Sequence, residues 1–145
     1  MSQKNVELVR GLQPAPDVDI AELFRDDEIW AALTEAVAPL SHSDFECVLH
    51  AIDSEPTTYP GLVGLRTGWL DWVAPWVTYR TEIKDVIDAG EQVLVLTHDF
   101  ARREGSTEDV KLIGAAVWTV RDGKIARAEF YTDRAEAFAA VGLEQ

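Results

Sequence analysis

The sequence has little of several things that define whole classes of protein. Its one cysteine, Cys47, has no partner for an internal disulfide, which is typical of proteins from a reducing compartment. Basic residues are outnumbered, with 13 Lys and Arg against 26 Asp and Glu, so the formal net charge is −13. Nucleic acid and anionic membrane surfaces repel a chain of that sign, and we expect neither as a partner.

Long hydrophobic runs are also missing. No apolar stretch is long enough to span a bilayer, and the first five residues lack the apolar core of a signal peptide. The sequence contains no Gly-rich phosphate loop, nucleophile elbow or Cys-x-x-Cys pair. Glu46 and His50 could converge on one strand face, but two ligands without a third make a poor metal site. We therefore expect a soluble, cytoplasmic protein with no cofactor and no metal.

What is present predicts a folded domain built around residues 88–134. The chain has 145 residues, of which 47% are apolar, enough for one domain over residues 1–145 that buries roughly 70% of its unfolded surface. Residues 88–134 read as three antiparallel strands, the last two joined by a two-residue turn at Asp122 and Gly123. With Asp122 and Gly123 as the two loop residues, residues that face each other across the hairpin have numbers that sum to 245. Val117 is therefore predicted to pair with Ala128. Both faces of the hairpin are partly apolar, which predicts helices on one face and a second copy, in a homodimer, on the other.

The rest of the chain predicts helices and strands that cover this meander. Residues 65–76 have an apolar stripe at helical spacing that carries Trp69, Trp72 and Trp76. The other expected elements are helices within 6–12, 20–24, 29–40 and 135–141, strands at 45–52 and 77–87, and irregular chain at 41–44 and 53–64. Helices gathered on one side of a curved antiparallel sheet make an α+β fold.

Three segments resemble a known family. They are YPGLVGL (59–65), WTVRDGKI (118–125) and EFYTDRAEA (129–137), and they are similar to SnoaL-like domains of the nuclear-transport-factor-two-like superfamily. The resemblance implies a cone-shaped fold with a cavity between helices and the concave face of the sheet. Relatives include polyketide cyclases, ketosteroid isomerase, limonene-epoxide hydrolase and members with no catalytic role.

The resemblance also indicates where acidic groups belong. Cyclase-like members carry an inward acid on the last strand, and the matching position here holds Phe130. Glu129 would replace that acid only if a bulge shifted the strand by one residue. A second inward acid, as in the epoxide hydrolase, falls on Asp99, but its companion arginine position holds Thr97. The full hydrolase constellation is therefore absent from the sequence.

Three residues are candidates for catalysis, each with a simpler alternative. Asp99 in an apolar cavity would be a general acid/base, or else a rim carboxylate near Arg102 or Arg103. His50 would be a second proton carrier, or a histidine satisfied by its own neighbours. Tyr59 would donate to a ligand oxygen, or cover the edge of the core. His98 adjoins Asp99 on the same strand and is predicted to point to the opposite face.

The expected ligand pocket is apolar, and its walls leave two functions open. Its residues are Trp69, Trp72, Trp76, Thr97, Val117 and Phe130, although an aromatic stripe on a helix is also typical of a core. One hypothesis is a cofactor-independent cyclase or isomerase that acts on an apolar, ring-containing small molecule. The other is a non-catalytic ligand-binding or dimerisation domain, which Phe130 at the position of the family acid favours.

Overall fold

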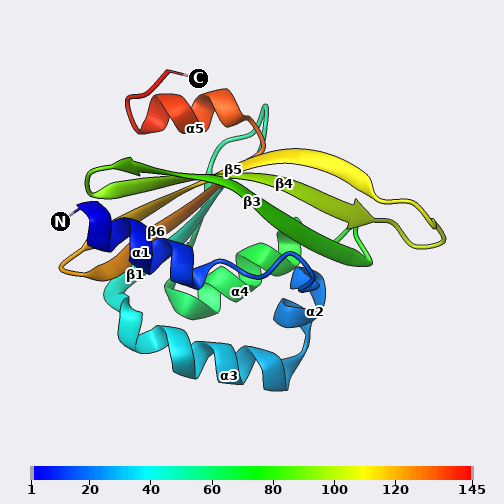
Figure 1. Ribbon diagram of the computed structural model, residues 1–145. Coiled ribbons are helices and arrows are strands. Elements are labelled where there is room, and N and C mark those ends of the chain that lie inside the picture. The colour runs from blue at the N-terminus through cyan, green and yellow to red at the C-terminus, as the bar shows by residue number, and fades with distance from the viewer. Residues whose placement is uncertain (1, 145) are drawn as a thin grey trace.

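The computed structural model describes residues 2–144 and contains one curved sheet with helices on both faces (Figure 1). The strand order is β2-β1-β6-β5-β4-β3. The β1–β6 pair is parallel and the other neighbours are antiparallel. The strands are β1 (Ser41–His50), β2 (Thr57–Pro60), β3 (Thr78–Ala89), β4 (Gln92–Arg102), β5 (Val110–Arg121) and β6 (Lys124–Tyr131).

The helices lie unequally on the two faces of the sheet. Figure 1 shows α1, α2, α3 and α4 below the sheet, on its concave face, and α5 above it. The helices are α1 (Ser2–Leu12), α2 (Ile20–Arg25), α3 (Asp27–Val37), the 3₁₀ turn η1 (Ala38–Leu40), α4 (Gly61–Trp72) and α5 (Arg134–Ala140). Asp19, Asp26 and Asp133 accept hydrogen bonds from the first turns of α2, α3 and α5 and so fix where those helices begin. The predicted α+β class, with helices on the concave face, is confirmed.

Three predicted elements have different bounds in the structure. The first strand begins at Ser41, inside a segment expected to be a loop. The segment expected to be irregular contains β2, which pairs with β1 and carries Tyr59 opposite Cys47. The tryptophan helix is α4 at Gly61–Trp72, so Trp76 lies beyond its end, next to Pro75. Pro75 cannot continue the helical hydrogen bonding, and the chain turns before it.

The register expected for the last hairpin was wrong by one residue over most of its length. Asp122 and Gly123 do form the turn, with φ of +55° and +75°. Beyond the turn Ala126 is an extra residue, because Val120 pairs with Ile125 but Thr119 pairs with Arg127. This β-bulge pairs Val117 with Glu129 instead of Ala128. A second bulge leaves Lys84 unpaired in β3, between Ile83 and Asp85.

The bulges sort side chains into two separate cores. The larger core fills the concave side and includes Val9, Phe24, Trp69, Tyr79 and Trp118. The smaller core, beneath α5, contains Leu94, Ala115, Val117, Tyr131 and Ala137. Val117 and Phe130 therefore lie on opposite faces, since a one-residue shift exchanges the faces of a strand. Within residues 2–144, no helix is long and apolar enough to cross a membrane.

Candidate functional site

A cavity of about 880 Å³ lies between the concave face of the sheet and the helical layer. Aromatic side chains from several elements line it: Phe24 from α2, Trp69 and Trp72 from α4, Tyr79 from β3, Trp118 from β5 and Phe130 from β6. Trp69 is central among them, stacked on Phe24 at 5.5 Å and edge-on to Phe130 at 5.0 Å between ring centroids. Both the size and the apolar wall are typical of a small-molecule site.

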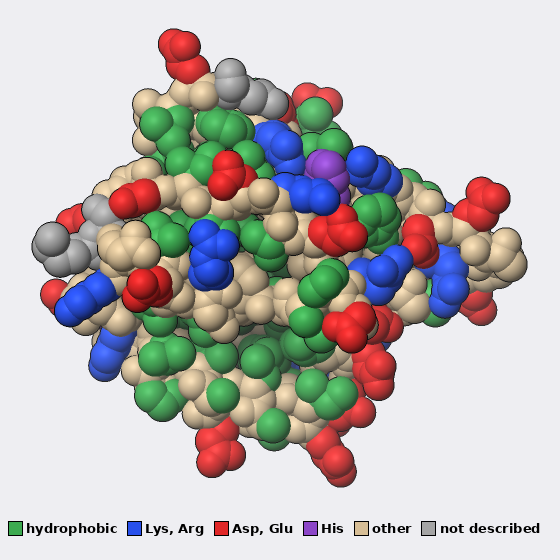
Figure 2. Space-filling model, in the orientation of Figure 1, with side chains coloured by type: hydrophobic (Ala, Val, Ile, Leu, Met, Phe, Trp, Pro, Cys, Tyr) green, Lys and Arg blue, Asp and Glu red, His purple; other side chains and the backbone are tan. Residues whose placement is uncertain are grey.

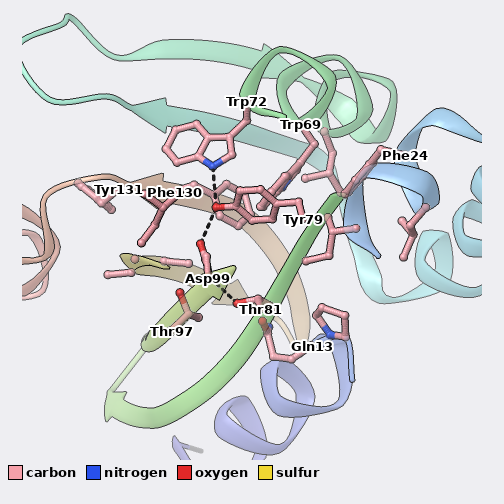
Figure 3. A pocket seen from close by; sticks show the side chains of 18 of the residues that line it. Gln13, Phe24, Trp69, Trp72, Tyr79, Thr81, Thr97, Asp99, Phe130 and Tyr131 are labelled. Carbon is pink, nitrogen blue, oxygen red and sulfur yellow. Dashed lines mark hydrogen bonds between the residues drawn. The ribbon is translucent and has the colours of Figure 1, made fainter. Parts of the chain in front are cut away.

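Asp99 is the one acidic residue among the residues that line this cavity. It is buried, with 8% of its surface exposed. Its Oδ2 accepts a hydrogen bond of 2.5 Å from the Tyr79 hydroxyl, and its Oδ1 accepts one of 2.6 Å from the Thr81 hydroxyl. Figure 3 shows these bonds and the neighbouring rings of Trp72 and Phe130. Such short O–H···O distances are characteristic of an ionised acceptor.

Tyr79 connects the carboxylate to the tryptophan helix. The indole Nε1 of Trp72 donates to the Tyr79 oxygen at 3.3 Å, so the tyrosine hydrogen is left for Asp99 (Figure 3). Burial, together with the adjacent Asp99, raises the pKa of Tyr79 well above its usual value. The main chain of Tyr79 is held as well, because its N–H donates to the Asp19 side chain at 3.0 Å. Asp99 therefore has a rigid, neutral donor on one side.

Gly114 in β5 leaves the room that Asp99 occupies. A Cβ on Gly114 would lie 2.8 Å from Thr97 Oγ1 and 3.1 Å from Asp99 Oδ2. Gly114 pairs with Thr97 of β4, and Leu112, two residues before Gly114, pairs with Asp99. Any side chain at this position would push the two polar groups off the cavity wall.

Most of the predicted pocket residues lie around this cavity. Its lining includes Trp69, Trp72, Trp76, Thr97 and Phe130, along with Asp99. As expected, Asp99 and His98 point to opposite faces, because their strand is regular at this point.

The rim interpretation of Asp99 does not describe its surroundings. Asp99 is buried and forms no ion pair with Arg102 or Arg103. The guanidinium of Arg103 instead lies over the ring of Trp76, 4.9 Å from its centroid.

Three predicted site residues lie away from Asp99, which corrects the expected constellation. His50 is on the opposite face, where its Nε2 lies 2.8 Å from Glu129 Oε2 and its ring stacks on Tyr131. Val117 is on that face too, in the core beneath α5. Tyr59 covers the edge of the concave core and donates to Asp71 at 2.9 Å.

Sequence reasoning missed Tyr79 and Thr81, the two groups that hold Asp99. The expected turn near Gly90 could have given a register for β3 and β4, in which Ala89 pairs with Gln92. Counting back from that pair puts Glu82 opposite Asp99. The bulge at Lys84 shifts the strand, so Thr81 takes that place.

The described residues contain no cluster of three or more His, Cys, Asp or Glu side chains that could hold a metal ion. Asp99 accepts hydrogen bonds from two hydroxyl groups, and Glu129 is hydrogen-bonded to His50 and Tyr131 on the other face. What the cavity offers is one carboxylate, hydroxyl groups and aromatic rings. That set can bind an apolar molecule and exchange a proton with it.

Comparison with known proteins identifies the family. A family model described as "SnoaL-like domain" matches residues 27–128, which is more than half of the chain. The comparison with curated proteins found no match.

Solved structures show the same fold at low sequence identity. One is a protein from Jannaschia sp. CCS1 provisionally described as a SnoaL-like polyketide cyclase; it is 17% identical with a TM-score of 0.63, covering 99% of this chain and 95% of that one. TerC, co-crystallized with polyporic acid, is 20% identical with a TM-score of 0.63, covering 95% and 98%. An NTF2-like protein from Burkholderia xenovorans LB400 is 19% identical with a TM-score of 0.59, covering 97% of each chain.

Proposed function

Because this chain belongs to the SnoaL-like domain family, we propose that its cavity binds an apolar, ring-containing small molecule and that Asp99 transfers a proton on it. One observation carries the proposal: a buried carboxylate faces an aromatic cavity and is held there by two hydroxyl groups. The activity would be that of a cofactor-independent isomerase or cyclase. On the sequence evidence, its expected location is the cytoplasm.

In this mechanism Asp99 is both base and acid. It removes a proton from one atom of the bound ligand and returns that proton to another, so the reaction needs no second reactant. Each carboxylate oxygen accepts one hydrogen bond and keeps a lone pair for the ligand. Tyr79 and Thr81 are positioning residues that fix the direction of those lone pairs. The hydroxyl of Thr97, on the same wall, can donate to a ligand oxygen.

The aromatic wall gives the ligand its orientation. Trp69, Trp72 and Phe130 present rings around the carboxylate, and a flat apolar molecule packs well against such surfaces (Figure 3). A ligand packed against these rings would displace water from the wall, and electrostatic interactions with the reacting atoms are stronger where water is excluded.

A second candidate function is ligand binding without catalysis. The position that matches the family acid on the last strand holds Phe130, which packs edge-on against Trp69 and Trp118. His50, the expected second proton carrier, lies on the other face of the sheet. A cavity with one carboxylate can serve as a binding site alone.

The same fold leads us to propose a homodimer. On the convex face Ile113 is 49% exposed, in the part of β5 that extends beyond the end of β6. A second copy would cover this side chain. Sedimentation at micromolar concentration tests the proposal, and a monomer mass would exclude the homodimer.

Deuterium exchange tests catalysis without knowledge of the natural substrate. Ring-containing ketones are first screened for binding by the change in tryptophan fluorescence. Binders are then incubated with the protein in D₂O, and NMR follows the loss of hydrogen next to the carbonyl. We expect wild type to accelerate exchange and Asp99→Asn to lose about 100-fold or more of that rate, the usual share of a general base.

The matched control is Asp71→Asn, which changes an exposed carboxylate bonded to Tyr59. We expect it to exchange ligand protons at the wild-type rate. Binding without exchange in wild type would favour the non-catalytic function. Equal exchange by wild type and Asp99→Asn would refute the role of Asp99.

A further inference from the structure

The cavity contains a carboxylate, Asp99, that has no ion-pair partner among the residues that the structure describes. Asp99 is 8% exposed, and both groups that donate to it, Tyr79 and Thr81, are neutral hydroxyls. None of the ion pairs among residues 2–144 includes Asp99. An ionised carboxylate that is buried without a counter-charge is unfavourable. A cation bound beside Asp99 would supply that counter-charge.

The walls next to Asp99 also suit a positive charge. Tyr79, Trp69 and Phe130 form a continuous aromatic group, with centroid distances of 5.8 Å and 5.0 Å from Trp69 to its two partners. The π face of an aromatic ring attracts ammonium and guanidinium groups. One ring of this cavity already binds a cation, because Arg103 lies over Trp76.

Three basic side chains lie on the face of the sheet opposite to Asp99. Lys111 is the one basic residue among those that line the cavity. Lys111 pairs with Phe100, which follows Asp99 in β4. Because neighbouring residues of a strand point to opposite faces, the side chains of Lys111 and Phe100 point away from the face that carries Asp99. On the opposite face desolvation, followed by the positive charges of Lys111, Lys84 and Arg134, lowers the pKa of His98. Figure 2 shows basic side chains gathered around a histidine and acidic ones spread over much of the visible face. A net charge of −13 attracts cations over long distances.

We propose that the ligand of this cavity is an organic cation, an apolar, ring-containing molecule whose protonated or quaternary amine lies against Asp99 and between the aromatic rings. The inference rests on the proposed function, since it concerns the same cavity, and it adds the charge of the substrate. The two roles of Asp99 are compatible. A carboxylate has about four acceptor positions, of which Tyr79 and Thr81 occupy two.

Two probes of equal shape isolate the charge. Benzyltrimethylammonium and neopentylbenzene differ in one atom, a cationic nitrogen in place of a neutral carbon. Their binding to the full chain is measured by tryptophan fluorescence at fixed ionic strength. For wild type we expect the cation to bind at least about tenfold more tightly than its neutral isostere, the size of a desolvated cation–π contact and ion pair.

Variants assign that preference to Asp99. In Asp99→Asn the cation should lose about tenfold or more in affinity, while neopentylbenzene should stay within about twofold of wild type. Asp71→Asn, which removes a negative charge outside the cavity, should keep the preference for the cation. Circular dichroism confirms that each variant is folded, and the wild-type comparison of the two probes needs no variant.

The outcomes separate this inference from the function on which it rests. Equal binding of the two probes to wild type would overturn the organic cation and leave an apolar, neutral ligand for the same cavity. An equal loss for both probes in Asp99→Asn would overturn it too, because charge would not be the cause. If neither probe nor any ketone of the screen binds, the proposed function fails together with the inference.

Discussion

Two tyrosine–carboxylate pairs lie on opposite faces of the same sheet, and they have different surroundings. On the concave face Tyr79 donates to Asp99 at 2.5 Å beside an open cavity. On the convex face Tyr131 donates to Glu129 at 3.3 Å, and His50 lies 2.8 Å from the same carboxylate oxygen. Burial raises the pKa of both tyrosines, with the adjacent carboxylate as the second cause.

The two pairs differ in whether the carboxylate is available to a ligand. Glu129 has a histidine partner that can carry the opposite charge, and its neighbours Tyr131 and Val117 are packed beneath α5. Asp99 has neutral hydrogen-bond partners and lines the cavity. A half-buried carboxylate such as Glu129, packed and hydrogen-bonded to its neighbours, contributes to stability. One that is buried beside a cavity is available to a ligand.

The largest expected effect on stability is at the pair of Tyr131 and Glu129 on the convex face. Glu129→Ala should lower the free energy of unfolding by about 2–3 kcal/mol, because it leaves His50 and the Tyr131 hydroxyl without a partner on a covered face. Urea unfolding measures the loss. Binding of cavity ligands should not change, since Glu129 faces away from them.

Glu46→Ala is the matched control for that variant. Glu46 pairs with Arg127 on the same two strands, but both side chains are substantially exposed. Its loss should cost about 0.5 kcal/mol or less. Equal losses for Glu129→Ala and Glu46→Ala would contradict the distinction between a packed and an exposed pair.

Alkaline pH should destabilise the fold through both tyrosines. Below about pH 10 the hydroxyls are protonated in folded and unfolded chains alike; above it the unfolded chain loses protons that the folded chain keeps. Stability therefore falls as pH rises, by about 1.4 kcal/mol per pH unit for each tyrosine. Cys47, whose pKa burial raises to about 12, adds a loss of the same sign.

Urea unfolding from pH 8 to 11 measures this slope. Tyr79→Phe and Tyr131→Phe should each make it shallower by a similar amount, although each also lowers stability at pH 8 by loss of a hydrogen bond. Tyr59→Phe should change the slope less, because its hydroxyl donates to Asp71 at the surface. A slope unchanged in both buried variants would refute this account.

A smaller effect is expected from the second donor to Asp99. Thr81→Val keeps the shape of the side chain and removes the hydroxyl, so Asp99 Oδ1 loses its bond. We expect a loss of about 1 kcal/mol in urea unfolding, and Thr81→Ser should recover most of it. The same two variants measured for deuterium exchange separate positioning from stability: Val should lower the rate and Ser restore it.

The smallest expected change in stability is at Gly114. In Gly114→Ala the new methyl group meets the ends of two side chains, Thr97 and Asp99, which can rotate away. We expect a loss of less than about 1 kcal/mol but a several-fold weaker ligand affinity, because Asp99 is displaced. The double variant Gly114→Ala/Thr97→Ala removes the closest contact and should regain part of the affinity. Unchanged affinity in Gly114→Ala would show that Asp99 does not contact the ligand.

Patterns within single elements were enough to predict much of this protein. The turn at Asp122 and Gly123 and the alternation along β4 depend on neighbouring residues, and they gave correct elements. Alternation also put Asp99 on the face opposite His98. For the same reason the tryptophans of α4 could be named before the cavity was known, whereas Phe130 was named from the family resemblance.

The partners of Asp99 were decided by the tertiary structure. One extra residue in β3, Lys84, brings Thr81 opposite Asp99 where regular pairing would bring Glu82. One extra residue in β6, Ala126, moves Val117 to the convex face with Glu129. A bulge leaves no clear signal in a sequence, because it depends on how two whole strands pack and curve against the helices. Local chemistry thus determined which residues could react, and strand pairing across the sheet determined which of them meet.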